Sequence, residues 1–282
     1  MKLNVKILVC CHKQDIFAKQ EPYFPIHVGR ALSQNNLDIT GDDTGENISE
    51  KNSSYCELTG LYWAWKNLKD VDVIGLCHYR RYLDFHHQCQ KWFSRTIFPT
   101  SKFEELDLSV PQSIIDEVTK GKIIAPKKKN YPNSLFTDYC IAHVSDDLRT
   151  LKEIVNETND SKYIRAFDKV MNHTHKLIHY NMFLMNWKDF DSYCHWLFDI
   201  LGKVEEKTNI ENYTPIQKRI YGYMAERLFN IWLVANKRDV IYKPVMTIKD
   251  NHVRERLTPQ YIIRMFWQNF SFKMLSPLRN EF

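Results

Sequence analysis

The sequence predicts an α/β fold, in which a mixed sheet is flanked by helices. Short apolar runs rich in Val, Ile and Leu have the length and composition of buried strands. Longer segments with apolar residues at helical spacing lie between these runs, and strands that alternate with helices favour a sheet covered on both faces. A chain of 282 residues is long enough for one large domain, or for one domain with an appended tail.

The first predicted strand covers residues 3–9 and is followed by the loop Cys10-Cys11-His12-Lys13. The polar stretch from Asp38 to Ser54 predicts a long loop, and loops of this length inside a compact domain are usually functional. A helix is expected to begin at its end, because Ser54-x-x-Glu57 matches a capping box and apolar residues follow at helical spacing.

The same alternation continues along the chain. Thr214-Pro215-Ile216-Gln217 combines a capping Thr, a Pro at the first helical position and a Gln partner, which predicts a long helix to about Val234. The other predicted elements are strands at residues 71–77, 122–125 (ended by Pro126) and 178–185, and helices at residues 146–157, 161–173 and 187–203.

Cysteine usage and hydropathy predict a cytoplasmic protein. The seven Cys residues include no C-x-x-C pair and no metal-ligand spacing, which indicates free thiols in a reducing compartment. The N-terminal apolar stretch is short and interrupted by Asn4 and Lys6, so a signal peptide is not expected. No stretch approaches the roughly 18 apolar residues of a membrane-spanning helix.

The net charge of +5 belongs to the C-terminal end of the chain. From Lys237 onward there are nine basic and four acidic residues, so residues 1–236 carry no net charge. We therefore expect a main domain at residues 1–245 and a basic amphipathic extension at residues 246–282. A helix is predicted to begin at Thr258-Pro259, with Tyr261, Ile262, Met265 and Phe266 on one side, accompanied by Arg264, Gln268 and Lys273. Such a helix either lies on an anionic membrane surface, at the inner face of the plasma membrane, or packs back on the domain.

Several common catalytic motifs are absent. The sequence contains no G-x-G-x-x-G, G-x-x-x-x-G-K-[ST], G-x-S-x-G or H-E-x-x-H. This weakens the case for a dehydrogenase, a P-loop NTPase, an α/β hydrolase or a zinc protease.

The first candidate site is the segment His78-Tyr79-Arg80-Arg81-Tyr82. It directly follows a predicted buried strand, and open α/β sheets bind ligands beyond the carboxyl ends of their strands. Two adjacent Arg residues can grip a diphosphate through charge-assisted hydrogen bonds. The alternative is that one Arg pairs with an internal carboxylate.

The second candidate site is the polar loop from Asp42 to Asn52. Helix N-termini attract anions, Lys51 adds positive charge, and Asp42 or Asp43 can accept a hydrogen bond from a ribose or sugar hydroxyl. The alternative is an Asx-type turn without a ligand.

Three weaker candidates follow. Glu226 lies in the middle of a predicted helix among apolar residues, where it either pairs with Arg227 or serves as the carboxylate that deprotonates an acceptor hydroxyl. The basic run Lys127-Lys128-Lys129, with Tyr131, Tyr139 and His143, is either a binding surface or a solvated loop. Asn181-Met182-Phe183 either lines an acceptor subsite or closes a strand.

Taken together, these segments resemble a known family. The run from Asp43 to Asn52 is followed by Tyr55-Cys56-Glu57-Leu58-Thr59, by Tyr62-Trp63-Ala64-Trp65-Lys66-Asn67 and by Gly75-Leu76-Cys77-His78-Tyr79-Arg80-Arg81-Tyr82. Further on come Tyr180-Asn181-Met182-Phe183, Trp196-Leu197-Phe198 and Ala225-Glu226-Arg227-Leu228. Over about residues 3–245 the sequence resembles a bacterial family long labelled a domain of unknown function, found in capsule, exopolysaccharide and lipopolysaccharide gene clusters. That family is classed with glycosyltransferases, and some members resemble galactofuranosyltransferases. The segment 43–82 is the most specific part of the match.

The resemblance implies a GT-A-like fold and an inverting transfer of galactofuranose or another hexose from a UDP-sugar to a hydroxyl of a lipid-linked glycan. On this basis Glu226, or failing it Asp43, is the expected catalytic base. The residues expected to bind the nucleotide sugar are His12, Lys13, Asp42, Asp43, Asn47, Lys51, Asn52, His78, Tyr79, Arg80 and Arg81. Those expected to bind the acceptor are His143, Asn181 and Met182.

The sequence departs from the usual GT-A pattern at the metal site. Such enzymes carry a D-x-D at the end of the strand that here ends in Cys77-His78, whereas Asp70-Val71-Asp72 lies at its start. Either Asp42 or Asp43 holds Mn²⁺ or Mg²⁺, or Arg80 and Arg81 replace the metal. We favour replacement, and so expect no required cofactor.

Two other classes of protein remain open from the sequence. The first is a non-catalytic carbohydrate- or nucleic-acid-binding protein. Nucleic acid is not the expected partner, because the positive charge is confined to one end and no reader motif occurs. The second is a nucleotide-sugar hydrolase, which would release free sugar without an acceptor.

Overall fold

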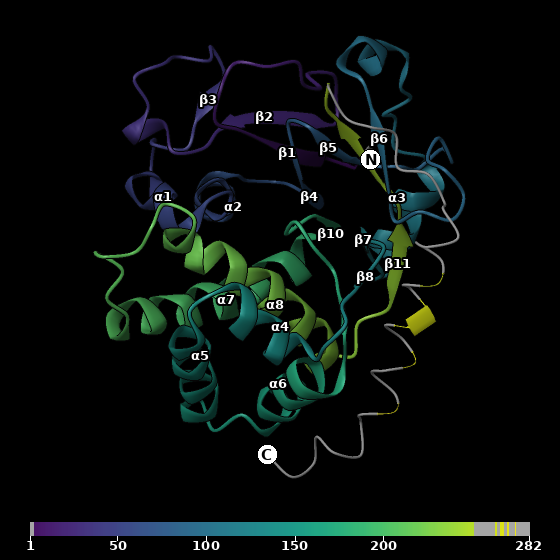
Figure 1. Cartoon of the computed structure of the whole chain (residues 1–282). Helices are drawn as coiled ribbons and strands as arrows, with labels where there is room; N and C mark the ends of the chain where they lie inside the picture. Colours follow the sequence, from purple (N-terminus) through teal and green to yellow (C-terminus); the bar gives the residue numbers. More distant parts are fainter. Residues whose placement is uncertain (1–2, 251–262, 264–265, 268–269, 271–273, 275–282) are drawn as a thin grey trace. The chain divides into compact units, whose positions relative to one another are not determined.

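The computed structural model describes residues 3–250 together with residues 263, 266, 267, 270 and 274 (Figure 1). The described chain forms two compact units. Unit 1 contains residues 3–127, 180–195 and 238–250, and unit 2 contains residues 128–179 and 196–237.

Unit 1 is built on a mixed sheet. Its strands are β1 (Val5–Cys11), β2 (Tyr23–His27), β3 (Thr40–Gly41), β4 (Val73–His78), β5 (Arg81–Leu83), β6 (Arg95–Phe98), β7 (Ile123–Pro126), β10 (Phe183–Asn186), β11 (Val240–Lys243) and β12 (Val245–Ile248). The order along the sheet is β11-β7-β10-β4-β1-β2-β3, with β5, β12 and β6 branching from β4. Strand β1 is parallel to both β2 and β4, whereas β10 is antiparallel to β4 and β7.

Unit 1 also contains short helices that lie between these strands in the sequence. They are α1 (Asn52–Tyr55), α2 (Leu58–Asn67) and α3 (Gln112–Thr119), with short 3-10 helices at η1 (Arg30–Leu32), η2 (Ser49–Lys51) and η3 (Thr100–Glu105). Helix α2 packs closely on the sheet at Gly60, where a Cβ atom would lie 2.7 Å from Val28 Cγ1. Side chains from β1, β4 and β5 form one buried core with those of α3 and β12. The parallel strands β1 and β4 are therefore both anchored in this buried core.

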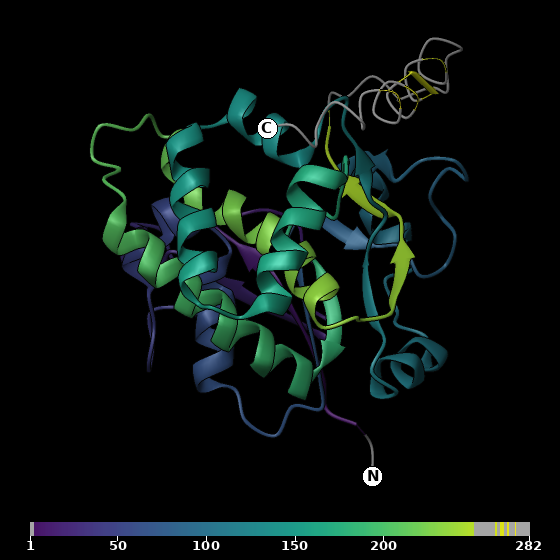
Figure 2. The same ribbon diagram turned by 90° about the horizontal axis from the view of Figure 1, so that it is seen from below.

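Unit 2 is mainly helical. Its elements are β8 (Lys129–Asn130), α4 (Leu135–Ala142), α5 (Ser145–Glu157), α6 (Ser161–His173), β9 (Lys176–Leu177), η4 (Gln217–Arg219) and α8 (Ile220–Ala235). Helix α6 packs on α8 and α5, and Figure 2 shows the three helices side by side. Helix α7 (Trp187–Lys207) begins in unit 1 and ends in unit 2.

The predicted α/β fold is confirmed, with differences of detail. The strands at residues 71–77 and 122–125 and the helices at residues 146–157 and 161–173 lie within one or two residues of the observed elements. The expected strand at 178–185 begins only at Phe183, because Tyr180 and Asn181 have left-handed backbone angles, with φ of 73° and 52°. The sheet also continues past the expected domain boundary at residue 245, since β12 runs to Ile248.

One of the two capping boxes is present. Thr214 Oγ1 accepts a hydrogen bond from the Gln217 amide, and Gln217 Oε1 accepts one from the Thr214 amide, although η4 precedes the α-helix that begins at Ile220. The prediction of a capping box at Ser54-x-x-Glu57 is wrong. The Ser54 hydroxyl donates to the Lys51 carbonyl, and the Glu57 side chain makes no capping bond.

No helix in the described part of the chain is both long and apolar enough to cross a membrane. The predicted helix start at Thr258-Pro259 and the side chains of Tyr261, Ile262 and Met265 lie outside the described residues. Phe266 is described, and its backbone is helical.

Candidate active site

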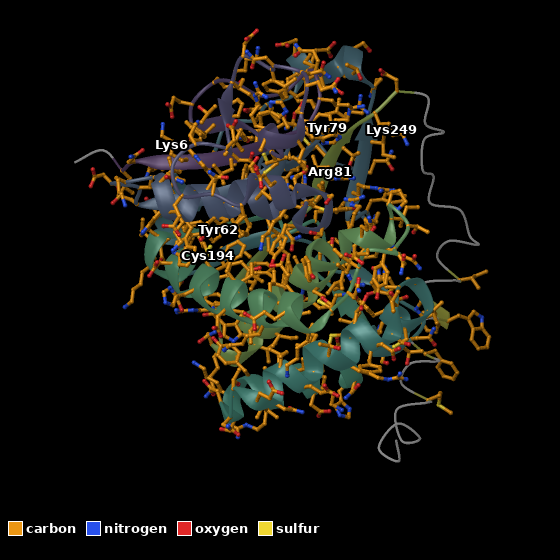
Figure 3. The ribbon with its side chains drawn as sticks, turned by 90° about the vertical axis from the view of Figure 1, so that its left-hand side faces the viewer. Lys6, Tyr62, Tyr79, Arg81, Cys194 and Lys249 are labelled. Atoms are coloured by element: carbon orange, nitrogen blue, oxygen red, sulfur yellow. The ribbon has the colours of Figure 1, made fainter. Side chains whose placement is uncertain are left out.

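The first candidate segment lies at the carboxyl ends of two parallel strands. Strand β4 ends at His78, which is in register with Cys10 near the end of β1. The Tyr79 amide donates to the Cys10 carbonyl, and the chain then turns back into β5 at Arg81. Figure 3 shows Tyr79 and Arg81 together at this end of the sheet, away from Lys6 near the start of β1. This is the edge at which α/β sheets bind ligands.

Arg80 is held by the protein itself. Its guanidinium forms an ion pair of 2.5 Å with Asp15, whose side chain is only 10% exposed. The phenol of Tyr82, expected in the candidate site, is fully buried; it accepts from the Ala18 amide and donates to the Tyr79 carbonyl. Asp15 also lines a cavity of about 630 Å³ with Lys19 and others. The alternative weighed for the Arg pair, an internal carboxylate partner, therefore applies to Arg80.

Arg81 is the cation that this edge leaves available. Its guanidinium lies 4.8 Å from the centre of the Tyr180 ring, and it forms no ion pair with any described residue. The side chain is half-buried, so an anion bound there would be partly shielded from water. Arg81 is therefore better suited than Arg80 to bind a phosphate group, because its charge is not already paired.

His78 is a neutral hydrogen-bonding group. Its Nε2 lies 2.7 Å from the Tyr180 carbonyl, and since a carbonyl only accepts, Nε2 carries the proton. Burial lowers the pKa of His78, opposed by the Glu57 carboxylate and assisted by Arg81. His12, exposed in the loop after β1, meets the Tyr79 ring edge-on at 5.2 Å, and Lys13 is also exposed.

The second candidate segment contains residues of two kinds. Asp42 is fully buried, and its carboxylate accepts from the Gly29 and Arg30 amides at 2.9 and 3.0 Å and from the Ser49 hydroxyl. Asp43 next to it is exposed. Asp42 therefore fixes the loop, and the expectation that it binds a ligand hydroxyl does not fit its surroundings.

The two Asn residues of this segment also support the backbone. Asn47 accepts from the Ser49 amide and donates to the Gly45 carbonyl, which is the Asx-type turn weighed as the alternative. The Asn52 amide group donates to the Cys56 carbonyl and to Thr59 Oγ1. Lys51 is exposed, with its ammonium 5.9 Å from the centre of the Tyr55 ring. Lys51 and Asp43 are the side chains of this loop best placed to bind a ligand.

The predicted acceptor residues in unit 1 are buried. Met182 is 0% exposed and belongs to the core, so it cannot contact an acceptor as expected. Asn181 is 3% exposed and donates to Glu57 Oε1 at 2.8 Å. Sequence reasoning missed this bond because Glu57 had been explained as a helix cap.

In unit 2, Glu226 is part of a charged and aromatic cluster. Its carboxylate lies 3.1 Å from Arg227 Nη1 and 3.7 Å from His179 Nδ1, the internal ion pair weighed in the sequence analysis. His143 stacks on the Tyr223 ring at 4.2 Å and meets the Tyr139 ring at 4.7 Å. Flat rings with polar edges suit a sugar ring.

Burial, together with the nearby Arg227, lowers the pKa of His143 to about 4. In the unfolded chain His143 titrates near pH 6.5, so between about pH 6.5 and 4 the unfolded state binds a proton that the folded state does not. Stability should therefore fall as the pH falls through this window. His143→Phe keeps a ring against Tyr223 and removes the titration, so lowering the pH from 7 to 4.5 should cost wild type more stability than the variant, by about 1 kcal/mol once solvent screening of the partly exposed His143 is included. Urea denaturation at both pH values measures this, and equal losses would contradict it.

The residues near the expected metal position do not fit a divalent-metal site. The Asp42 carboxylate already accepts three hydrogen bonds, which leaves Asp43 as the available one of the two Asp residues expected to hold a metal. Among the described residues, no group of three or more His, Cys, Asp or Glu side chains is arranged to hold a metal ion.

The fold agrees with the class of protein that the comparisons define. The chain belongs to the family described as a domain of unknown function (DUF4422), whose profile matches residues 6–237. A solved structure titled "WbbM bifunctional glycosytransferase apo structure" is similar to it, with a TM-score of 0.78 and 31% sequence identity. The match covers 90% of this chain and 48% of that chain, so the protein spans about half the length of that relative. No curated protein matches the chain. The expected glycosyltransferase-like fold and family are thus confirmed.

Proposed function

We propose that the protein is a glycosyltransferase that moves a sugar, galactofuranose or another hexose, from a UDP-sugar to a hydroxyl of a lipid-linked glycan in surface polysaccharide synthesis. The observation that carries this proposal is the fold shared with a bifunctional glycosyltransferase over 90% of the chain. A second observation is Arg81, which lies at the carboxyl edge of the sheet in unit 1. Its guanidinium has no ionic partner among the described residues. The reaction proceeds with inversion, in the cytoplasm.

The proposed donor site lies in unit 1. Arg81 binds the diphosphate, and the proposed set of donor-binding residues also includes Lys51, His12 and Lys13, whose side chains are exposed. A hydrogen bond to a charged group contributes roughly 1.5–3 kcal/mol. Three such bonds would supply much of the roughly 8 kcal/mol that a micromolar site needs.

Unit 2 contributes a surface for carbohydrate. We assign a carbohydrate contact to the stacked rings of His143 and Tyr223, which are both only partly buried. Glu226 on the same helix offers a carboxylate to sugar hydroxyls, although that carboxylate is also paired with Arg227.

Two measurements on the purified protein test the function. A thermal-shift screen should show stabilisation by a UDP-sugar, and incubation with that donor and a lipid-linked glycan should release UDP and extend the glycan. Donor binding without transfer would favour a carbohydrate-binding protein, and release of free sugar without acceptor would favour a hydrolase. Either outcome would overturn the proposal.

Transfer should not need a divalent metal. Because Arg81 supplies a positive charge where the leaving diphosphate develops its negative charge, we expect turnover in excess chelator to stay within about threefold of the untreated rate. The matched control is the same assay with added Mn²⁺. Activity abolished by chelator and restored by manganese would contradict metal independence.

We also propose that the C-terminal extension contacts an anionic membrane surface. Five described residues there have helical backbone and are 48–75% exposed: Ile263, Phe266, Trp267, Phe270 and Met274. Their spacing places them on one face of a helix, and the surrounding sequence from Lys237 onward carries the whole net positive charge. An apolar face with aromatic rings in a basic segment is typical of helices that lie in a lipid interface.

Liposome flotation tests this contact. The full chain should float with vesicles that contain phosphatidylserine, and truncation after Val253 or the pair Trp267→Glu and Phe270→Glu should abolish flotation. Trp92→Glu, at another exposed aromatic residue, is the matched control and should float like wild type. Equal flotation with and without the extension would contradict the proposal.

A further inference from the structure

Three residues around Glu57 have positive φ angles. Cys56, which separates α1 from α2, has φ 53° and ψ −131°, and Tyr180 and Asn181 are consecutive residues with positive φ. None of the three is glycine, and although Asn tolerates positive φ, residues such as Cys56 and Tyr180 adopt it only when their surroundings enforce it. Strain of this kind concentrates at functional sites, where it aims a side chain or a carbonyl group.

Specific hydrogen bonds hold this strained backbone in place. The Asn52 side chain donates to the Cys56 carbonyl at 2.7 Å, and His78 Nε2 donates to the Tyr180 carbonyl at 2.7 Å. The Asn181 side chain donates to Glu57 Oε1 at 2.8 Å. Two loops far apart in the sequence are thereby fixed to each other at the Glu57 carboxylate, inside unit 1.

Glu57 lies at the same edge as the proposed donor site. The Glu57 carbonyl accepts from the Cys10 thiol near the end of β1, and the Glu57 carboxylate and Arg81 both act on the charge of His78. The carboxylate is bonded to Asn181, the residue next to Tyr180, and the Tyr180 ring lies 4.8 Å from the guanidinium assigned to the diphosphate.

The Glu57 carboxylate is also available for chemistry. Its side chain is partly exposed, and it forms no ion pair with any described residue. Within the described chain its hydrogen bond to Asn181 uses Oε1 and leaves Oε2 unbonded. The sequence explained Glu57 as a helix cap, a role that the structure does not show, and residues that break a local rule in this way are often functional.

We propose that Glu57 is the catalytic base of the transfer and that Asn181 positions it. This inference rests on the proposed glycosyltransferase function. The acceptor hydroxyl oxygen forms a bond to the anomeric carbon while its proton passes to Glu57 Oε2. The bond from the anomeric carbon to the diphosphate oxygen breaks, and its electron pair leaves with UDP. The assignment replaces Glu226 and Asp43 in this role, since Glu226 is paired with Arg227 and Asp43 belongs to an exposed loop.

Glu57→Gln tests the inference, because Gln keeps the shape and an oxygen that can accept from Asn181. The variant should bind the UDP-sugar like wild type and unfold at the same temperature, while kcat falls about 10²- to 10⁴-fold. The acidic limb of the pH–rate profile, which reports the protonation of the base, should disappear from the residual activity. Glu21→Gln, at an exposed carboxylate paired with Lys6 far from this edge, is the matched control and should keep wild-type kcat.

The outcomes separate this inference from the proposed function. If wild type transfers sugar and Glu57→Gln does so within a few-fold of its rate, only the assignment of Glu57 is wrong. If wild type transfers no sugar from any UDP-sugar, the proposed function itself fails. If Glu57→Gln does not fold, Glu57→Asp takes its place and should fold, bind donor and turn over slowly. Failure of that variant to fold would show a structural role and overturn the inference.

Discussion

Arg81→Ala should reduce sugar transfer by about 10²- to 10³-fold, the usual loss when one group that stabilises developing charge is removed. The guanidinium has no ionic partner among the described residues, so the fold loses only its contact with the Tyr180 ring. Such a cation–π contact is worth roughly 0.5–1 kcal/mol at a partly exposed site. The variant should therefore unfold close to the wild-type temperature while losing both UDP-sugar binding, measured by calorimetry, and turnover.

The neighbouring residue is the matched control for this prediction. Arg80→Ala leaves the nearly buried Asp15 carboxylate without its partner, so it should lower the free energy of unfolding by about 1–3 kcal/mol. The two substitutions remove the same charge from adjacent positions. Arg81→Ala should act mainly on catalysis, and Arg80→Ala mainly on stability. If both leave turnover within a few-fold of wild type, the assignment of this edge as the donor site is wrong.

The fold could be predicted from the sequence where a strand or helix carries its own signal. Strand β7 is a continuous apolar run, β4 is apolar up to His78, and β1 is apolar apart from Lys6, while α5 and α6 show helical spacing with polar flanks. The short strands could not be found in this way. β5 has three residues and β3 has two, and both exist because a neighbouring strand offers them backbone partners. Their pairing depends on tertiary structure, which local propensity does not record.

The candidate site was predicted as a segment, but not residue by residue. That His78–Arg81 follows a buried strand was visible in the sequence, and so was the polar character of residues 42–52. Which of two adjacent residues turns inward was not visible. Arg80 and Arg81, and likewise Asp42 and Asp43, differ only in the partners that the fold brings to them. The bond between Glu57 and Asn181 joins residues 124 positions apart, and no local pattern predicts it.

The adjacent pair Asp42 and Asp43 gives the largest expected effect on stability. Asp42→Ala leaves the Gly29 and Arg30 amides and the Ser49 hydroxyl without their acceptor in a site that is closed to water. An unsatisfied buried donor costs about 1–3 kcal/mol, so the free energy of unfolding should fall by about 3 kcal/mol or more. Urea denaturation followed by tryptophan fluorescence measures it.

Asp43→Ala is the matched control for Asp42→Ala. Its side chain is exposed, so stability should change by no more than about 0.5 kcal/mol. The sequence predicted that Asp43 accepts a hydrogen bond from a hydroxyl of the UDP-sugar. If it does, Asp43→Ala should weaken UDP-sugar binding without unfolding the loop. Equal losses of stability in the two variants would contradict the division of this loop into a buried support and an exposed ligand. A stable Asp42→Ala variant would contradict it too, and would return Asp42 to the set of candidate ligands, because its carboxylate would then be dispensable for the fold.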